Sequence, residues 1–247
     1  MQAFVANNAK VYIASRSLKS CERKAQELND SGPGQCIPLA ADLGTLEGCK
    51  SLAKQIAERE SALHILVNNS GTSWGEPMET YPDEAWDKLW NLNVKSVFNL
   101  SRALLPQLDA GSSAGDPARI INVGSIAGLQ PQPIPTYAYD TSKAAVHMLT
   151  RKLGGELANR KAEGGHGITV NAIAPGFVPS RMSAQLLTYA SEEGIASGVP
   201  LGRLGTPEDM GGAALFLASR AGAWMTGSVV TVDGGAVAQP ITMDPKL

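Results

Sequence analysis

The chain alternates between short apolar runs and longer stretches in which apolar residues recur three and four positions apart. The short runs, rich in Val and Ile, predict buried strands, and the periodic stretches predict amphipathic helices. Such alternation is typical of a parallel sheet covered on both faces by helices, so we expect an α/β, doubly wound, Rossmann-like fold. The predicted strands are 10–14, 36–41, 63–67, 119–128 (running into a loop), 168–174 and 228–232, and the predicted helices are 18–29, 46–60, 86–108, 138–157, 180–190 and 207–219.

Length and composition favour one domain. A chain of 247 residues with 43% hydrophobic content can bury roughly three quarters of its unfolded surface in a single core. The sequence contains neither an internal repeat nor a linker that would divide it. We therefore expect a single domain over residues 1–247.

Charge and hydropathy restrict the partners. A formal net charge of −2 gives no electrostatic footprint for nucleic acid or for an anionic membrane. No stretch approaches the ~20 consecutive apolar residues of a membrane span, and the first residues lack the pattern of a signal peptide. We expect an intracellular, cytoplasmic protein. Its three Cys and three His residues are spaced for neither a disulfide framework nor a metal site, so no metal is predicted.

The predicted helix 138–157 carries a Tyr and a Lys four positions apart, Tyr139 and Lys143. Positions four apart share one face of a helix, so both side chains can reach the same space. A nearby cation stabilises a phenolate and lowers the pKa of the tyrosine, which could then act as a general acid or base. This spacing also arises by chance in many sequences, so it needs support from elsewhere in the chain.

That support comes from Ser125, which follows the apolar run RIINV (119–123). Ligands of open parallel sheets lie at the carboxyl ends of the strands, so the hydroxyl of Ser125 can face the same space as Tyr139. Together, Ser125, Tyr139 and Lys143 resemble the catalytic constellation of the short-chain dehydrogenase/reductase family.

Other motifs extend the resemblance from residue 1 to about residue 235. The sequence NNSG (68–71) resembles the family's Asn-Asn-Ala-Gly signature, with Ser70 in place of alanine, and Asn93 matches the helix asparagine that holds a proton-relay water. Pro175 and Gly176 match the turn beside the nicotinamide, and DGG (233–235) matches the close of the last strand.

The resemblance implies an NADP(H)-dependent oxidoreductase that reduces a ketone to a secondary alcohol, with a 3-oxoacyl thioester as the favoured candidate. Tyr139 would donate the proton, Ser125 would bind the carbonyl oxygen, Lys143 would lower the pKa of the tyrosine, and Asn93 would support the relay. The family also assembles as homodimers or homotetramers through its long helices. The cofactor-binding residues implied are Arg16, Asp42, Leu43, Asn69, Ser70, Gly71, Tyr139, Lys143, Pro175, Gly176 and Val178.

Arg16 decides which cofactor we expect. Enzymes of this fold that use NAD commonly place an acidic residue at the end of an early strand, whereas those that use NADP offer a basic residue to the 2′-phosphate. Ser15 and Arg16 occupy this corner here. The resemblance implies that Arg16 binds the phosphate and that Asp42 contacts the adenine.

The glycine-rich turn with which the family opens is not found before residue 10. In the family, this turn and the following helix bind the pyrophosphate, and the strand before it lies between the strands that here end at Ala14 and Val67. We therefore expect a sheet that lacks its first strand, in a chain truncated relative to the family. The competing hypothesis is a catalytically silent form that binds cofactor poorly or only assembles with full-length subunits.

Overall fold

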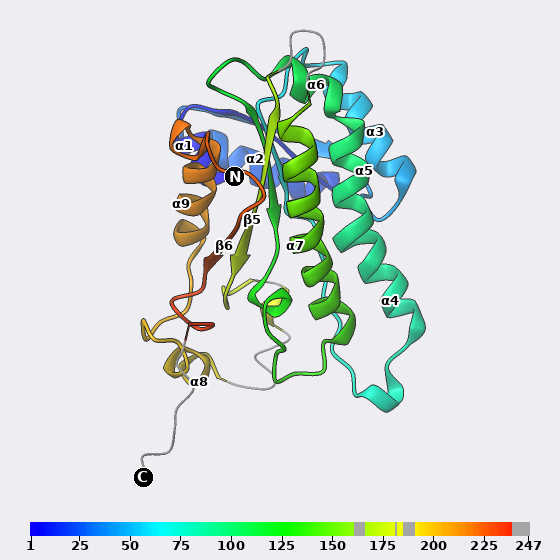
Figure 1. Cartoon of the computed structure of the whole chain (residues 1–247), viewed down its shortest axis with the longest axis vertical. Coiled ribbons are helices and arrows are strands. Elements are labelled where there is room, and N and C mark those ends of the chain that lie inside the picture. Colours follow the sequence, from blue (N-terminus) through cyan, green and yellow to red (C-terminus); the bar gives the residue numbers. More distant parts are fainter. Residues whose placement is uncertain (161–165, 181, 185–190, 239–247) are drawn as a thin grey trace.

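The computed structural model describes residues 1–160, 166–180, 182–184 and 191–238. In this part of the chain, the strands pair in parallel and in two groups (Figure 1). Strand β1 (Lys10–Ser15) pairs with β2 (Gln35–Ala40). Strands β3 (Ile65–Asn68), β4 (Ala118–Val123), β5 (Ile168–Pro175) and β6 (Val229–Val232) pair in that order. The α/β class is confirmed, and β1 and β3 do not pair, at the place where the sequence predicts an interrupted sheet.

Helices cover the four-stranded sheet on both faces. Figure 1 shows α5 (Ser96–Ala103) and α7 (Tyr137–Ala158) on one side of β4, β5 and β6, with α9 (Pro207–Ala218) and α1 (Gln2–Ala6) on the other. The largest cluster of buried apolar side chains lies between the sheet, α5, α7 and α3 (Leu46–Ala57). A smaller cluster joins Ile121 and Ile173 to Leu217 of α9. These two layers hold the carboxyl ends of the strands in place.

Side-chain caps explain where several helices begin. The hydroxyl of Ser17 accepts a hydrogen bond from the Ser20 N–H at the start of α2 (Leu18–Asn29), and Thr45 caps α3 in the same way. Thr206 and Asp209 form a capping box at the start of α9. Such caps satisfy backbone N–H groups that have no partner inside the helix. Helix α2 has the predicted bounds, and α7 differs from its predicted bounds by one residue at each end.

The predicted helix 86–108 is wrong as a single element. The structure divides this stretch into α4 (Asp83–Leu89), a π-helical segment η2 (Trp90–Lys95), α5, and α6 (Leu105–Ala110). Leu104 leaves helical geometry between α5 and α6, and Pro106 stands at the start of α6, where a missing N–H costs nothing. The π-helical segment contains Asn93, whose side chain points into the protein.

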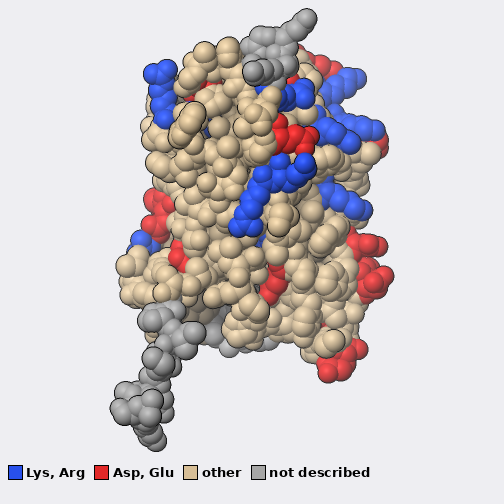
Figure 2. All heavy atoms as spheres, in the orientation of Figure 1, with Lys and Arg blue, Asp and Glu red and all other residues tan. Residues whose placement is uncertain are grey.

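Short elements complete the described chain, and most of the predicted helix 180–190 lies outside it. The short elements are η1 (Met78–Thr80), η3 (Ile126–Gly128), α8 (Glu192–Ser197) and η5 (Arg220–Gly222). Of the helices described, not one is long and apolar enough to cross a membrane. On the face drawn in Figure 2, Lys and Arg side chains lie mainly over the upper half with Asp and Glu among them, and Asp and Glu prevail over the lower half.

Candidate active site

Tyr139 and Lys143 lie one turn apart on α7, with the Lys143 ammonium 5.6 Å from the centre of the Tyr139 ring. Lys143 is buried, and its Nζ donates a hydrogen bond to the carbonyl oxygen of Val123 at 2.8 Å. Burial lowers the pKa of Lys143 to about 8. Because the ammonium is stripped of most of its water, a negative group brought to this site would interact with it strongly.

Ser125 lies at the carboxyl end of β4, beside Tyr139. Hydrogen bonding to the Ser125 side chain lowers the pKa of the Tyr139 phenol, but burial raises this pKa more, so the net shift is upward. In the protein alone, the pKa of Tyr139 thus moves in the opposite direction from the one expected from Lys143, and its lowering by Lys143 stays a prediction. The sequence could not reveal this, because the shift depends on how closely the surrounding protein encloses the phenol.

Asn93 is almost completely buried and joins three parts of the site. Its Nδ2 donates to the Thr72 carbonyl oxygen and to the Ser142 hydroxyl, and its Oδ1 accepts from the Thr72 N–H. Ser142 donates in turn to the Tyr139 carbonyl oxygen at 2.7 Å. Both protons of the Asn93 amide are therefore engaged, and its side chain links the turn after β3 to α7. Thr72 and Ser142 are two contributors that the sequence motifs did not single out.

Three predicted cofactor-binding residues meet at the end of β3. Leu43, Asn69 and Ser70 line one small hollow, together with Val67 and Ser96. Gly71 follows directly: a Cβ atom there would lie 3.3 Å from Asn93 Oδ1 and 3.7 Å from Lys143 Nζ. The NNSG turn therefore brings its backbone close to the catalytic candidates.

Pro175 is the last residue of β5, and Gly176 follows it and approaches the turn after β6. The Gly176 N–H donates to the Val232 carbonyl oxygen, and a Cβ atom at residue 176 would lie 2.8 Å from Asp233. Only glycine fits this close approach. Val178 packs two residues further on, against Gly205. The contacts described for these three residues do not include Tyr139, so their role in cofactor binding stays a prediction.

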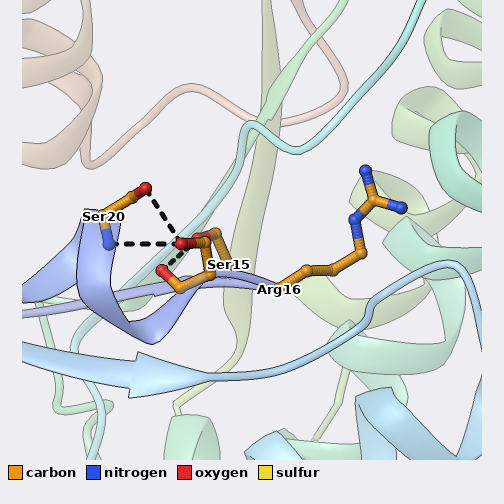
Figure 3. A pocket seen from close by; sticks show the side chains of 4 residues that line it. Ser15, Arg16 and Ser20 are labelled. Carbon is orange, nitrogen blue, oxygen red and sulfur yellow. Dashed lines mark hydrogen bonds between the residues drawn. The ribbon is translucent and has the colours of Figure 1, made fainter.

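Arg16 and Asp42 lie beside the two-stranded group, β1 and β2. They follow β1 and β2, whose last residues pair, and Ser15 accepts a backbone hydrogen bond from Ala41. Arg16 is exposed and lines a hollow of about 480 Å³ with Ser15, Ser17 and Ser20. Figure 3 shows the guanidinium extending away from the hydrogen-bonded serines. The Asp42 carboxylate accepts from the Gly44 N–H, so it also shapes the turn after β2.

A buried polar chain crosses the sheet behind the site, and the sequence motifs did not predict it. Asn68 donates to the Ser101 hydroxyl and to Asn122 Oδ1, and Asn122 donates to the Thr150 hydroxyl of α7. These groups satisfy one another across α5, β3, β4 and α7. The available signal was Asn122 itself, a polar residue inside an apolar strand that has to find a buried partner.

Residues 1–237 match the family model described as Enoyl-(Acyl carrier protein) reductase. The chain is also 34% identical to the Short-chain dehydrogenase/reductase PhomF of Diaporthe leptostromiformis, over 95% of this chain and 85% of that protein. With the fold and the motifs described above, these matches define the class, and the chain belongs to the short-chain dehydrogenase/reductase family. It is an oxidoreductase by this membership.

Two matches are more similar in sequence, and a third is more distant. The chain is 43% identical to the Rhamnolipids biosynthesis 3-oxoacyl-[acyl-carrier-protein] reductase of Pseudomonas aeruginosa, over 95% of this chain and 89% of that protein. The solved Pseudomonas aeruginosa RhlG/NADP active-site complex matches with a TM-score of 0.87 at 42% identity, over 95% and 89% of the two chains. A gluconate 5-dehydrogenase from Burkholderia cenocepacia, in complex with NADP and tartrate, matches with a TM-score of 0.85 at 25% identity, over 97% and 89%.

Proposed function

We propose that this protein reduces a ketone to a secondary alcohol with NADPH, and that its substrate class is the 3-oxoacyl thioesters. The observation that carries the proposal is the convergence of Ser125 from β4 with Tyr139 and Lys143 from α7. NADPH, when bound, supplies the hydride, and the side chains supply position and electrostatics.

Each of the three side chains has a separate role in this proposal. Ser125 donates a hydrogen bond to the substrate carbonyl oxygen, where negative charge develops during reduction. The Tyr139 hydroxyl donates a proton to the same oxygen, and the neutral phenol favoured by burial is the form that can do so. Lys143 stabilises the phenolate that remains and binds the ribose of the nicotinamide. Asn93 holds the turn after β3 and helix α7 in fixed positions relative to each other, and it supports the proton relay.

Residues at two places, the end of β1 and the turn after β3, fit parts of NADPH. The exposed Arg16 guanidinium beside the hollow at Ser15 and Ser20 suits the 2′-phosphate, a dianion that favours a planar, charged donor. A Cβ atom at Gly71 would make a tight contact with Asn93 Oδ1 at 3.3 Å, so the backbone of this turn runs close to Asn93 and Lys143. We assign Arg16, Asp42, Leu43, Asn69, Ser70, Gly71, Tyr139, Lys143, Pro175, Gly176 and Val178 to the cofactor site.

The names of the relatives support the substrate class. 3-Oxoacyl-[acyl-carrier-protein] reductases are found in Pseudomonas aeruginosa, at 43% identity, and in Thermotoga maritima, at 32% identity. The stretches GTSWG (71–75) and PSRM (179–182) lie outside the general family motifs and favour the branch that contains the Pseudomonas protein. The alternative of a catalytically silent chain finds no support in the comparisons.

The exposed apolar side chains of α4, η2, α5 and α7 support a homodimer or a homotetramer. Trp86, Trp90 and Phe98 are each more than a third exposed, and Met148 of α7 is 62% exposed. Large apolar side chains left in water mark surfaces that another chain can cover. Light scattering of the purified protein would give the molar mass, and a monomer at all concentrations would refute this assembly.

The test of the function compares two tyrosine variants in the reduction of a 3-oxoacyl thioester, followed by the loss of NADPH absorbance. Tyr139→Phe removes the proton donor, and loss of a general acid typically costs ~10²- to 10⁴-fold in rate. Tyr137→Phe is the matched control, because that ring is 41% exposed and two residues away on the same helix. Equal rates for wild type and Tyr139→Phe would refute the assignment.

A further inference from the structure

His147 is a buried titratable residue that the proposed mechanism does not use. It lies one turn after Lys143 on α7 and is only 2% exposed. Neither ring nitrogen makes a hydrogen bond of normal geometry with the described residues, although buried polar groups are usually paired. Burial lowers the pKa of the ring, as do Lys143 and Arg151, and the Gly128 backbone offsets only part of this effect. The imidazole is therefore neutral at neutral pH.

The His147 ring occupies the space in which a side chain at residue 124 would lie. A Cβ atom on Gly124 would stand 2.2 Å from His147 Nε2 and 2.7 Å from its Cδ2. Contacts this short do not occur, so a side chain at residue 124 requires the His147 ring to move. On the other side, the Gly124 N–H donates to the Ile173 carbonyl oxygen of β5 at 2.8 Å. Gly124 is thus enclosed between β5 and His147, directly before Ser125.

A second contact holds the far end of the same turn. A Cβ atom on Gly128 would lie 2.6 Å from the Lys143 carbonyl carbon and 2.7 Å from the Ala144 nitrogen, so the chain rests on the backbone of α7 there. Lys143 also reaches the Val123 carbonyl oxygen, just before the turn. The turn that carries Ser125 is therefore seated at both ends on the helix that carries Tyr139 and Lys143.

We propose that His147 is a positioning residue, whose ring fills the space beside Gly124 and thereby holds Ser125 in place against Tyr139. His147 acts through its volume, since neither ring nitrogen makes a hydrogen bond of normal geometry with the described residues. The inference rests on the proposed function of Ser125 and Tyr139. Without the ring, Gly124 gains room to move toward α7, and Ser125 moves with it.

The test separates the volume of the ring from its chemistry. Because misplacement by about 1 Å can cost ~10²-fold, we expect His147→Ala to lower kcat by about 10- to 100-fold. The KM for NADPH should stay within about twofold, since the cofactor contacts are untouched. His147→Leu, of similar volume, should keep kcat within about threefold of wild type, since volume-conserving core changes are tolerated best. Equal losses in the Leu and Ala variants would overturn the volume argument.

A double variant tests the contact itself. Gly124→Ala places a Cβ against the ring and should lower kcat, whereas Gly124→Ala combined with His147→Ala should be faster than Gly124→Ala alone, because the Cβ enters the vacated space. If His147→Ala does not fold, Gly124→Ala and His147→Leu still test the proposal. A wild-type kcat in Gly124→Ala would overturn it.

The pH profile distinguishes positioning from a structural role. Hydrogen bonding to Ser125 lowers the pKa of Tyr139, so His147→Ala should move the Tyr139 limb of the kcat profile to higher pH, and Ser125→Ala should move it in the same direction. A variant that is merely less stable would leave this limb in place. Full activity of His147→Ala beside an inactive Tyr139→Phe would refute the inference alone. Full activity of Tyr139→Phe would refute the proposed function, and the inference with it.

Discussion

Asn93 and Thr72 hold each other by two reciprocal hydrogen bonds: the Thr72 N–H donates to Asn93 Oδ1 at 2.9 Å, and Asn93 Nδ2 donates to the Thr72 carbonyl oxygen at 3.0 Å. A third bond joins Asn93 to Ser142 on α7 at 2.9 Å. A side chain from the π-helical segment thus fixes both the turn after β3 and the helix of Tyr139. Asn93 therefore contributes to the geometry of the site from both sides.

Asn93→Ala should therefore destabilise the protein as well as slow the reaction. Three buried hydrogen bonds at about 1 kcal/mol each, with their partners left unsatisfied, predict a loss of about 3 kcal/mol in the free energy of unfolding. Denaturant melts would measure it. Asn91→Ala, in the same segment and partly exposed, is the control. An equal loss of stability in that variant would show that the hydrogen bonds of Asn93 make no particular contribution.

Arg16→Ala should change cofactor preference. A charge-assisted hydrogen bond of ~1.5 to 3 kcal/mol to the 2′-phosphate predicts that NADPH binds roughly 10- to 150-fold more weakly, with NADH nearly unaffected. Calorimetric titration with each cofactor would measure both affinities. Arg23→Ala is the matched control, since Arg23 is exposed on α2 and pairs with Glu27. Equal losses for NADPH and NADH would mean that Arg16 is structural.

Lys143→Met should show a stability difference that depends on pH. Burial lowers the folded-state pKa of Lys143 from 10.5 to about 8, so between these values the unfolded chain binds the extra proton and stability rises with pH. Below pH ~8 the buried charge destabilises the wild type. A shift from 10.5 to about 8 at 1.36 kcal/mol per pKa unit corresponds to a destabilisation of about 3 kcal/mol. Denaturant melts from pH 7 to 10 should show the advantage of Lys143→Met shrinking as pH rises. A constant difference would contradict this.

Asn68 and Asn122 should be coupled in stability. Asn68 Nδ2 donates to Asn122 Oδ1 at 2.9 Å inside the sheet, so removing either amide leaves the other unsatisfied at ~1 to 3 kcal/mol. We expect Asn68→Ala and Asn122→Ala to lower the free energy of unfolding by less together than the sum of their separate effects. Strict additivity in the double-mutant cycle would show that the two amides act independently.

The sequence by itself determined the elements whose signals are local. The periodicity of residues 18–29 predicts the bounds that α2 has in the structure, where Ser17 caps its first turn. The i, i+4 spacing alone places Tyr139 and Lys143 on one face of α7, since helix geometry needs no distant partner. The apolar runs likewise predict the strands, although the ends differ by one or two residues.

Only the tertiary structure decided the features that depend on groups distant in the chain. The stretch 86–108 has the composition of one helix, yet it contains a π-helical segment in which Asn93 bonds Thr72, 21 residues away. The pKa of Tyr139 moves upward because surrounding protein excludes water from the phenol, which no spacing of residues expresses. His147 and Gly124 are 23 positions apart, and nothing in the sequence shows that the His147 ring occupies the space beside Gly124. Local patterns encode backbone geometry, whereas burial and contact arise only when the elements pack.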